Sequence, residues 1–311
     1  MNRDKPSIKT KNFSTTVGKF KTTIEGLSAA KKQRLVLIIM SNTHDPVLKI
    51  SGAKDAIAVK KTFAEICAYT GYHFCSIEIT GVNYNYKNLF KTLDSVGLYN
   101  DVTVFYYSGH GFRYQNDSRY KYPQLDLRSH DNQPDFNKIN FIEENTENLK
   151  VLLQIMRLYG GRINIAIADC CNTVIKFPRK KESATEIDIA NDVMVAASKK
   201  FTKQLYADHS NQVCVLVSSS THGQPAIADN EIGSIFTHYF TEIIKGLLTK
   251  QSKTGQYFPW VKVLKTTAEK AFKESNKYNI GNGVAGKQKA VFEVYIESDD
   301  NYEKRMSKHG L

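Results

Sequence analysis

The sequence lacks the features that mark membrane-spanning or repetitive proteins. No apolar run approaches the roughly 18 residues needed to cross a bilayer, and the N-terminus has no apolar core of a secretory signal. The 311 residues contain no internal repeat and no low-complexity tract. With 41% hydrophobic and 24% charged residues, the composition is that of a globular chain long enough to bury a full core. We expect no membrane partner.

Cysteine is scarce, and its spacing argues against cross-links. The five cysteines are odd in number and include no Cys-x-x-Cys pair, so neither a disulfide framework nor a structural zinc site is expected. A reducing, cytoplasmic compartment fits this usage best. Cys67, Cys75, Cys170 and Cys214 are interpreted as small buried side chains, which leaves Cys171 to be weighed for chemistry.

Acidic residues are also in deficit, and the deficit is uneven. Lys plus Arg is 43 against 31 for Asp plus Glu, a net charge of +12. Residues 1–33 carry eight basic and two acidic residues, which is +6 and half of that total. We predict a basic N-terminal arm over 1–33, either a solvated extension or an arm that docks a partner. Nucleic-acid binding through it is the less favoured alternative, because it contains no known nucleic-acid module.

Strands and helices are predicted to alternate through the rest of the chain. The strand-length apolar segments suit a sheet buried on both faces. The alternation predicts an α/β fold: a doubly wound, mostly parallel six-stranded sheet flanked by helices. The expected strands are 34–40, 73–79, 101–107, 162–168, 212–218 and 288–297, and the expected helices are 53–69, 84–98, 143–159, 233–248 and 259–275. A further short strand is expected at 124–127, within a long surface excursion over 113–140.

Two of the predicted strands end in residues that can do chemistry. The third strand runs into His110, between two glycines, and the fourth runs into Cys171. Sites in open α/β sheets lie beyond the carboxyl ends of strands, so the two side chains share a crevice if these strands are neighbours. A thiolate with an imidazole in reach is the pair for nucleophilic acyl transfer. The backbone N–H groups of Gly111 and Cys171 are candidates for an oxyanion hole.

The two turns, taken together, resemble a known enzyme family. Residues 107–111 read Tyr-Ser-Gly-His-Gly, and 61 residues after the histidine comes Cys171, within Asp-Cys-Cys at 169–171. This combination resembles the caspases and metacaspases, with the likeness extending over about 34–250 and on to 297. Asn172 and Thr173 stand where metacaspases have histidine and serine, so the resemblance implies a divergent caspase-like cysteine peptidase. The implied peptidase domain is 34–297, with a large-subunit-like part at 34–172, a linker at 173–211, a small-subunit-like part at 212–297 and a polar tail at 298–311.

The resemblance assigns roles to the residues of the two turns. It implies a Cys–His dyad in which Cys171 is the nucleophile and His110 the acid–base, with Gly111 and Cys171 supplying the oxyanion N–H groups. The expected activity is endoproteolysis of protein substrates, held latent until a signal, a partner or processing assembles the site. The alternative is a caspase-fold pseudoenzyme or scaffold that acts by binding other proteins.

The resemblance also bears on which substrate residue, P1, precedes the cleaved bond. Caspases hold an aspartate with two arginines and a glutamine, and the matching positions here are Ile50, Ala228 and Asp169. A pocket with a carboxylate and neither arginine predicts Arg or Lys at P1, because a buried carboxylate needs a cationic partner. Ser108 and Asp55 are expected to line the same pocket. The alternative for Asp169 is a helix-capping carboxylate.

The linker and the acidic residues prompt two further expectations. Arg179, Lys180 and Lys181 would suit a protease with basic P1 preference, so self-processing there is one interpretation and a solvated basic loop the other. No contiguous calcium-binding loop is visible, so we expect a solvated acidic surface and no metal or other cofactor, with calcium dependence as the less favoured alternative. The acidic residues concerned are Asp126, Asp131, Asp135, Glu182, Glu186, Asp188 and Asp192.

Overall fold

The computed structural model describes residues 34–96, 101–115, 121–129, 144–158, 162–175, 211–251, 260–279 and 286–298. The chain divides into two units, Met1–Lys32 and Gln33–Leu311, and every described residue belongs to the second. The predicted basic arm, most of the predicted linker and residues 299–311 of the predicted tail therefore lie outside the described residues.

The centre of the fold is a six-stranded sheet in the order β12-β9-β7-β3-β1-β2. All neighbouring strands are parallel except β12, which is antiparallel to β9. The predicted mostly parallel six-stranded sheet is thus confirmed, and its third and fourth predicted strands, β3 and β7, are direct neighbours. The strands are β1 (Arg34–Ser41), β2 (His73–Ile79), β3 (Val102–Ser108), β7 (Ile163–Asp169), β9 (Asn211–Ser218) and β12 (Val291–Ser298).

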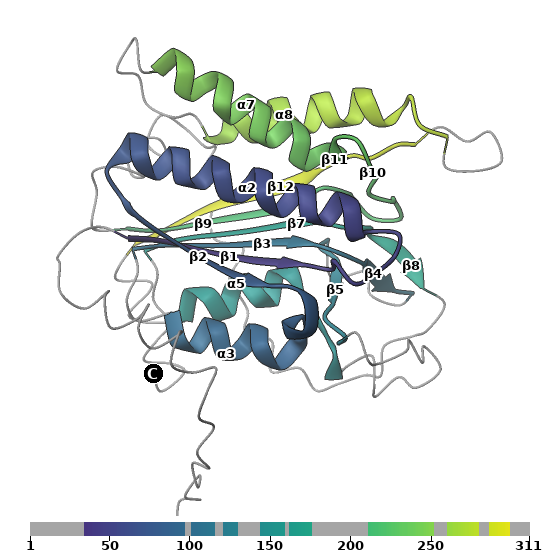
Figure 1. Cartoon of the computed structure of the whole chain (residues 1–311), viewed down its shortest axis with the longest axis horizontal. Helices are drawn as coiled ribbons and strands as arrows, with labels where there is room; N and C mark the ends of the chain where they lie inside the picture. The colour runs from purple at the N-terminus through teal and green to yellow at the C-terminus, as the bar shows by residue number, and fades with distance from the viewer. Residues whose placement is uncertain are drawn as a thin grey trace, which may run out of the picture. The chain divides into compact units, whose positions relative to one another are not determined.

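Helices cover both faces of the sheet, as a doubly wound fold requires (Figure 1). One face carries α2 (Lys49–Thr70), α7 (Ile235–Gln251) and α8 (Trp260–Ser275), and the other carries α3 (Tyr86–Val96) and α5 (Leu149–Leu158). Alternate residues of each strand enter opposite faces, because successive side chains of a strand point to opposite sides. Leu37 of β1 packs beneath α2, for example, while Ile38 packs beneath α3.

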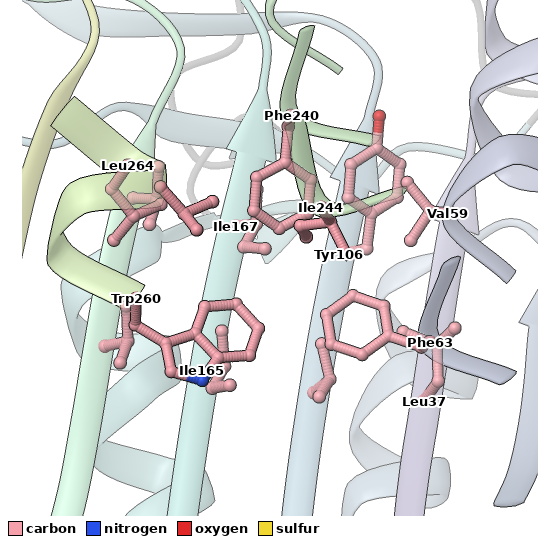
Figure 2. Close-up of a cluster of buried hydrophobic side chains, with 14 of the residues drawn as sticks. Leu37, Val59, Phe63, Tyr106, Ile165, Ile167, Phe240, Ile244, Trp260 and Leu264 are labelled. Atoms are coloured by element: carbon pink, nitrogen blue, oxygen red, sulfur yellow. The ribbon is translucent and has the colours of Figure 1, made fainter. Parts of the chain in front are cut away.

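The core on the α2 side is built around aromatic side chains (Figure 2). Trp260 of α8 is 2% exposed and stacks on Phe63 of α2, with ring centroids 6.4 Å apart and ring planes 20° apart. Phe240 of α7 lies 6.4 Å from the same Phe63 ring. These rings join helices from both ends of the described chain, and each pair adds about 1 kcal/mol beyond the burial of its area.

A second, four-stranded sheet lies at the carboxyl end of the main sheet, in the order β6-β5-β4-β8. Its strands are β4 (Gly111–Tyr114), β5 (Gln124–Asp126), β6 (Thr146–Asn148) and β8 (Thr173–Ile175). The sequence predicted only a short strand near 124–127 in this region. The expected helix 143–159 was partly wrong, because 146–148 pair with β5 and the helix begins at Leu149. Asn148 accepts a hydrogen bond of 2.9 Å from the N–H of Lys150, which fits its place just before that helix.

Other helix starts also differ from expectation, as in α3, which begins at Tyr86 and not at 84. Helix α2 begins at Lys49, four residues before the predicted 53, and it is capped after Thr70 by Gly71, where φ is +77° and the N–H bonds to Cys67 O. Gly233 and Ser234, predicted to open a helix, instead form β11 and pair with β10 (Ala228–Asp229), so α7 starts at Ile235.

Candidate active site

The candidate site lies where β1, β3 and β7 end side by side. Their last residues, Ser41, Ser108 and Asp169, are register partners across the three strands. In each strand, every second residue before this position is apolar and faces α2 and α7. The three polar residues therefore lie at the end of the apolar core on that face. All three are buried, and Asp169 is 3% exposed.

His110 occupies the turn between β3 and β4. Its carbonyl oxygen accepts hydrogen bonds from the Asp126 N–H at 3.0 Å and the Tyr107 hydroxyl at 2.6 Å, which fixes the backbone. The side chain is 47% exposed, and its Nε2 lies 2.8 Å from Oδ2 of Asp45. The imidazole is thus accessible to a substrate and already paired with a carboxylate.

Cys171 occupies the corresponding turn between β7 and β8. The residues on either side hold it in place: the Cys170 carbonyl accepts 2.7 Å from Ser220 Oγ, and the Asn172 N–H donates 3.0 Å to Gln224 O. The thiol Sγ accepts a 3.4 Å hydrogen bond from the backbone N–H of Ala226. Burial raises the pKa of the Cys171 thiol, the Ala226 N–H opposes that rise, and the charge of Asp169 adds to it. The thiol therefore rests in its neutral form.

The thiol and the imidazole come from adjacent turns. Within the described part of the chain, no hydrogen bond joins Cys171 Sγ to the ring of His110; the thiol contacts Ala226 and the ring contacts Asp45. Proton transfer between them needs the ring and the sulfur to approach.

Gly111 packs directly against the cysteine turn. A Cβ at this position would lie 2.5 Å from Cys170 Sγ and closer still to the Cys171 carbonyl oxygen. Only a residue without a side chain permits this approach. The structure therefore brings together the two residues whose N–H groups were predicted to form the oxyanion hole.

Asp55 of α2 reaches the row of strand ends and is 1% exposed. Its Oδ2 accepts hydrogen bonds from Ser108 Oγ at 2.9 Å and Ser234 Oγ at 2.5 Å, and its Oδ1 accepts from the Ser234 N–H at 2.8 Å. Burial and the charge of Asp169 raise the pKa of Asp55 to about 7, although these hydrogen bonds lower it. The predicted neighbours Asp55, Ser108 and Asp169 thus form one buried cluster.

Asp169 is the second carboxylate of this cluster. Its Oδ2 accepts from the Thr237 N–H at 3.0 Å and Thr237 Oγ1 at 2.7 Å. Because Thr237 donates to Asp169, Tyr106 Oη donates in turn to Thr237 Oγ1 at 2.6 Å. Oδ1 of Asp169 is buried and has no hydrogen-bond partner within 3.5 Å among the described residues, although the side chain of Ser219 interacts with this carboxyl and lowers its pKa. Burial raises the pKa of Asp169 as well.

The structure gives Asp169 part of the helix-capping role that was its alternative interpretation. Thr237 N–H belongs to the first turn of α7, so Asp169 does hold a helix N-terminus, though not of the helix that follows it in sequence. Oδ2 of Asp169 accepts the hydrogen bond at this helix N-terminus, and Oδ1 does not take part. The two interpretations of this residue are therefore compatible.

The remaining predicted positions fall in different places. Ile50 is half exposed on α2, and Ala228 is exposed on β10. Asp126, expected on a solvated acidic surface, is instead buried and paired with Arg128. Among the described residues, no group of three or more His, Cys, Asp or Glu side chains is placed to hold a metal ion. Outside the described residues lie the candidate self-cleavage sites Arg179, Lys180 and Lys181, and the acidic residues Asp131, Asp135, Glu182, Glu186, Asp188 and Asp192.

Sequence reasoning missed several residues of the site. Asp45 was findable in principle, because it follows β1 at the same sheet edge as the other two motifs. Ala226, Ser234 and Thr237 contribute through backbone groups or common hydroxyls. Nothing in the sequence distinguishes such residues from ordinary loop and helix positions.

A comparison with family models gives the broader context. The model of the caspase domain matches residues 33–289, which spans both turns and every strand of the main sheet except β12. The chain belongs to the caspase family. Family membership supports a cysteine-type peptidase in general, with proteins as substrates. A search among curated proteins found no matching relative. In the described residues of this caspase-family chain, no helix has both the length and the apolar character that a membrane crossing demands.

Proposed function

We propose that this caspase-family protein is a cysteine endopeptidase that cleaves proteins after arginine or lysine. The observation that carries the proposal is the pair of buried carboxylates, Asp55 and Asp169, beside the turn that bears Cys171. No Lys or Arg among the described residues forms an ion pair with either one. Buried carboxylates without a cation favour a ligand that brings one.

The pocket chemistry supports the P1 preference. A guanidinium or ammonium group would donate to Asp169 Oδ1, which has no close hydrogen bond in the described chain, and would lie near the carboxyl group of Asp55. An acidic P1 side chain would add a third carboxyl group to the same buried space, with no cation to pair with it. The half-exposed Ile50 and the exposed Ala228 provide no compensating positive charge.

In the proposed reaction Cys171 and His110 act as a dyad. The imidazole takes the thiol proton, and the thiolate attacks the carbonyl carbon of the P1 residue. The N–H groups of Gly111 and Cys171 hold the resulting oxyanion. The imidazolium then gives its proton to the leaving amine nitrogen as the C–N bond breaks. Water hydrolyses the thioester and restores the thiol.

The resting geometry supports a latent enzyme. The thiol pKa is raised by burial, and the ring of His110 is not bonded to the sulfur. Activation must therefore bring the ring to Cys171 and lower the free energy of the thiolate. Cleavage within 173–211, at or near Arg179, Lys180 and Lys181, is the proposed self-processing event, since this segment connects β7–β8 to β9.

The test is a panel of fluorogenic peptides with Arg, Lys, Asp or Asn at P1, with and without calcium. Wild type and Cys171→Ala are compared with Cys75→Ala, a half-buried cysteine on β2, as the control. Cleavage after Arg and Lys that is lost only in Cys171→Ala is expected. Cleavage after Asp would overturn the pocket assignment, and full activity of Cys171→Ala would overturn the nucleophile.

The scaffold alternative rests on one observation, the missing thiol–imidazole hydrogen bond. Covalent labelling separates the two functions, because a pseudoenzyme has no assembled site for a substrate-like electrophile. Labelling of Cys171 by an Arg-containing peptidyl electrophile, tracked by mass spectrometry, supports the peptidase. A chain that binds partners but never labels is a scaffold.

A further inference from the structure

Asp45 is held in one orientation by the loop between β1 and α2. Its Oδ1 accepts hydrogen bonds from the N–H groups of Val47 at 2.8 Å and Leu48 at 3.2 Å. Its own N–H donates 3.2 Å to Asn42 Oδ1, and the Asn42 N–H donates 2.9 Å to the Ser108 carbonyl oxygen at the end of β3. One oxygen thus anchors the carboxylate, and the other is presented to His110.

The contact with His110 fixes which ring nitrogen carries a proton. Partial burial raises the pKa of Asp45, but the hydrogen bonds from His110, Val47 and Leu48 outweigh it and hold the pKa below its usual value. The carboxylate is therefore ionised at neutral pH and can only accept. Nε2 of His110, 2.8 Å away, must be the donor, which leaves Nδ1 of the neutral ring with its lone pair.

We propose that Asp45 is a third member of the catalytic centre, a positioning residue that holds His110 in the tautomer with its proton on Nε2. The inference rests on the proposed peptidase function and adds to the dyad. During the reaction the thiol proton moves from Cys171 Sγ to Nδ1, and later from Nδ1 to the leaving amine. The Nε2 proton stays on the ring and donates to Asp45 throughout, so the carboxylate stabilises the imidazolium that forms between these two transfers.

The anchored oxygen leads to an unusual expectation for substitutions. In Asp45→Asn the amide oxygen would keep the backbone N–H bonds, because those need an acceptor, and the NH2 group would then face Nε2. Nε2 would have to accept, and the ring proton would move to Nδ1, where it blocks proton transfer from the thiol. Asp45→Ala removes the carboxylate without imposing the wrong tautomer. The closer mimic should therefore be the worse enzyme.

The kinetic test compares Asp45→Asn, Asp45→Ala and Asp45→Glu on an Arg peptide. We expect kcat to fall by about 10³- to 10⁴-fold in Asp45→Asn, the size of effect that a wrong tautomer has in hydrolytic triads. For Asp45→Ala we expect about 10- to 100-fold, as for other lost orienting partners, with KM within about twofold in both. Asp45→Glu should restore part of kcat.

A matched control is Glu78→Gln on β2, which breaks an exposed 2.7 Å ion pair with Lys60 of α2 and touches no residue of the site. It should leave kcat and KM unchanged. Equal kcat in Asp45→Asn and Asp45→Ala would overturn the positioning role. A gain of activity on removing Asp45 would also overturn it, since the contact would then be a latch.

A second measurement does not depend on activity. Nitrogen NMR of ¹⁵N-histidine protein in the Cys171→Ala background reads the tautomer of His110 directly. We expect the Nε2–H form in the parent, the Nδ1–H form after Asp45→Asn, and no single enforced tautomer after Asp45→Ala. The same ring state in all three overturns the inference. If the parent ring is as expected while wild type cleaves no peptide, the proposed peptidase function fails and the Asp45 contact stands.

Discussion

His110 and Cys171 occupy the same register position between two pairs of parallel strands. Before them, Ser108 of β3 is the partner of Asp169 of β7; after them, Phe112 of β4 is the partner of Thr173 of β8. Both pairings have an offset of 61 residues, which is also the spacing from His110 to Cys171. The turns are therefore two copies of one strand–turn–strand unit placed side by side, and the main sheet and the second sheet hold them from both ends.

Gly111 lies between these turns, and Gly111→Ala should disable the enzyme. The added methyl group would collide with the Cys171 carbonyl and with Cys170 Sγ, and the backbone atom cannot move without shifting the nucleophile. We expect kcat/KM on an Arg peptide to fall at least about 100-fold, as a displacement of about 1 Å at a catalytic group can cause. Gly246→Ala is the control: this exposed α7 glycine has open space around it, so activity should persist and stability rise by up to about 1 kcal/mol. An active Gly111→Ala enzyme would contradict the close packing.

Replacing either carboxylate of the pocket should weaken selection for a basic P1 residue. Asp169→Asn keeps the shape and an oxygen for Thr237, and Asp55→Asn is equally conservative. Each charge-assisted hydrogen bond is worth about 1.5–3 kcal/mol, so kcat/KM for Arg peptides should fall about 10- to 100-fold per substitution. Cleavage after Asn should change far less. The matched control is Asp94→Asn, at an exposed position of α3. Unchanged Arg preference in both pocket variants would place the P1 site elsewhere.

The raised pKa of Asp55 makes the stability of the protein depend on pH. At a folded pKa of about 7, against roughly 3.9 in the unfolded chain, the folded state keeps a proton that the unfolded state loses between about pH 4 and 7. This group therefore destabilises the fold progressively as pH rises through that window, and its effect levels off above it. The amide in Asp55→Asn does not ionise, so this variant lacks the pH-dependent contribution.

The measurement is urea unfolding at pH 5, 6, 7 and 8, followed by circular dichroism. The free energy of unfolding of Asp55→Asn minus that of wild type should grow by roughly 1 kcal/mol per pH unit from 5 to 7, then stop growing. Glu78→Gln, on the surface, should show no such trend. A difference that is flat with pH would mean that Asp55 is ionised throughout.

Cleavage in the predicted linker should not separate the two parts of the domain. Strand β7 precedes the linker and β9 follows it, yet they are adjacent and parallel over six register pairs. Asp55 and Ser234, 179 residues apart, are also joined by two hydrogen bonds across the same divide. We expect the cut protein to elute as one species in gel filtration and to give two bands only under denaturing conditions. Cys171→Ala should remain a single uncut chain. Cuts that persist in Cys171→Ala would show another protease at work.

The sheet was predictable from sequence because its strands are continuous apolar segments. A strand such as β1, which buries both faces, leaves little choice of structure. Because β3 and β7 are adjacent and parallel, His110 and Cys171, which follow them, lie at the same edge of the sheet. The strands of the second sheet were mostly missed because they are three or four residues long and owe their form to partners far away, as Thr146–Asn148 does to β5. A segment so short has no periodicity of its own to read.

The cluster around Asp55 illustrates the other limit. The resemblance named Asp55, Ser108 and Asp169, but not the groups that hold them. Ser234 and Thr237 lie on β11 and α7, and they reach the carboxylates because these elements fold back over the strand ends. Such partners depend on the path of the whole chain. Local sequence therefore identifies charged side chains more readily than it identifies the hydroxyl groups that donate hydrogen bonds to them.

Trp260, the only tryptophan in the sequence, gives the molecule a built-in optical probe. Its ring stacks on Phe63, so it lies on the boundary between the part before the predicted linker and the part after it. Its buried position should give blue-shifted emission that iodide quenches poorly. A red shift then means that α8 has left α2, and an unlabelled sample in a fluorimeter can report whether the two halves of the domain remain in contact.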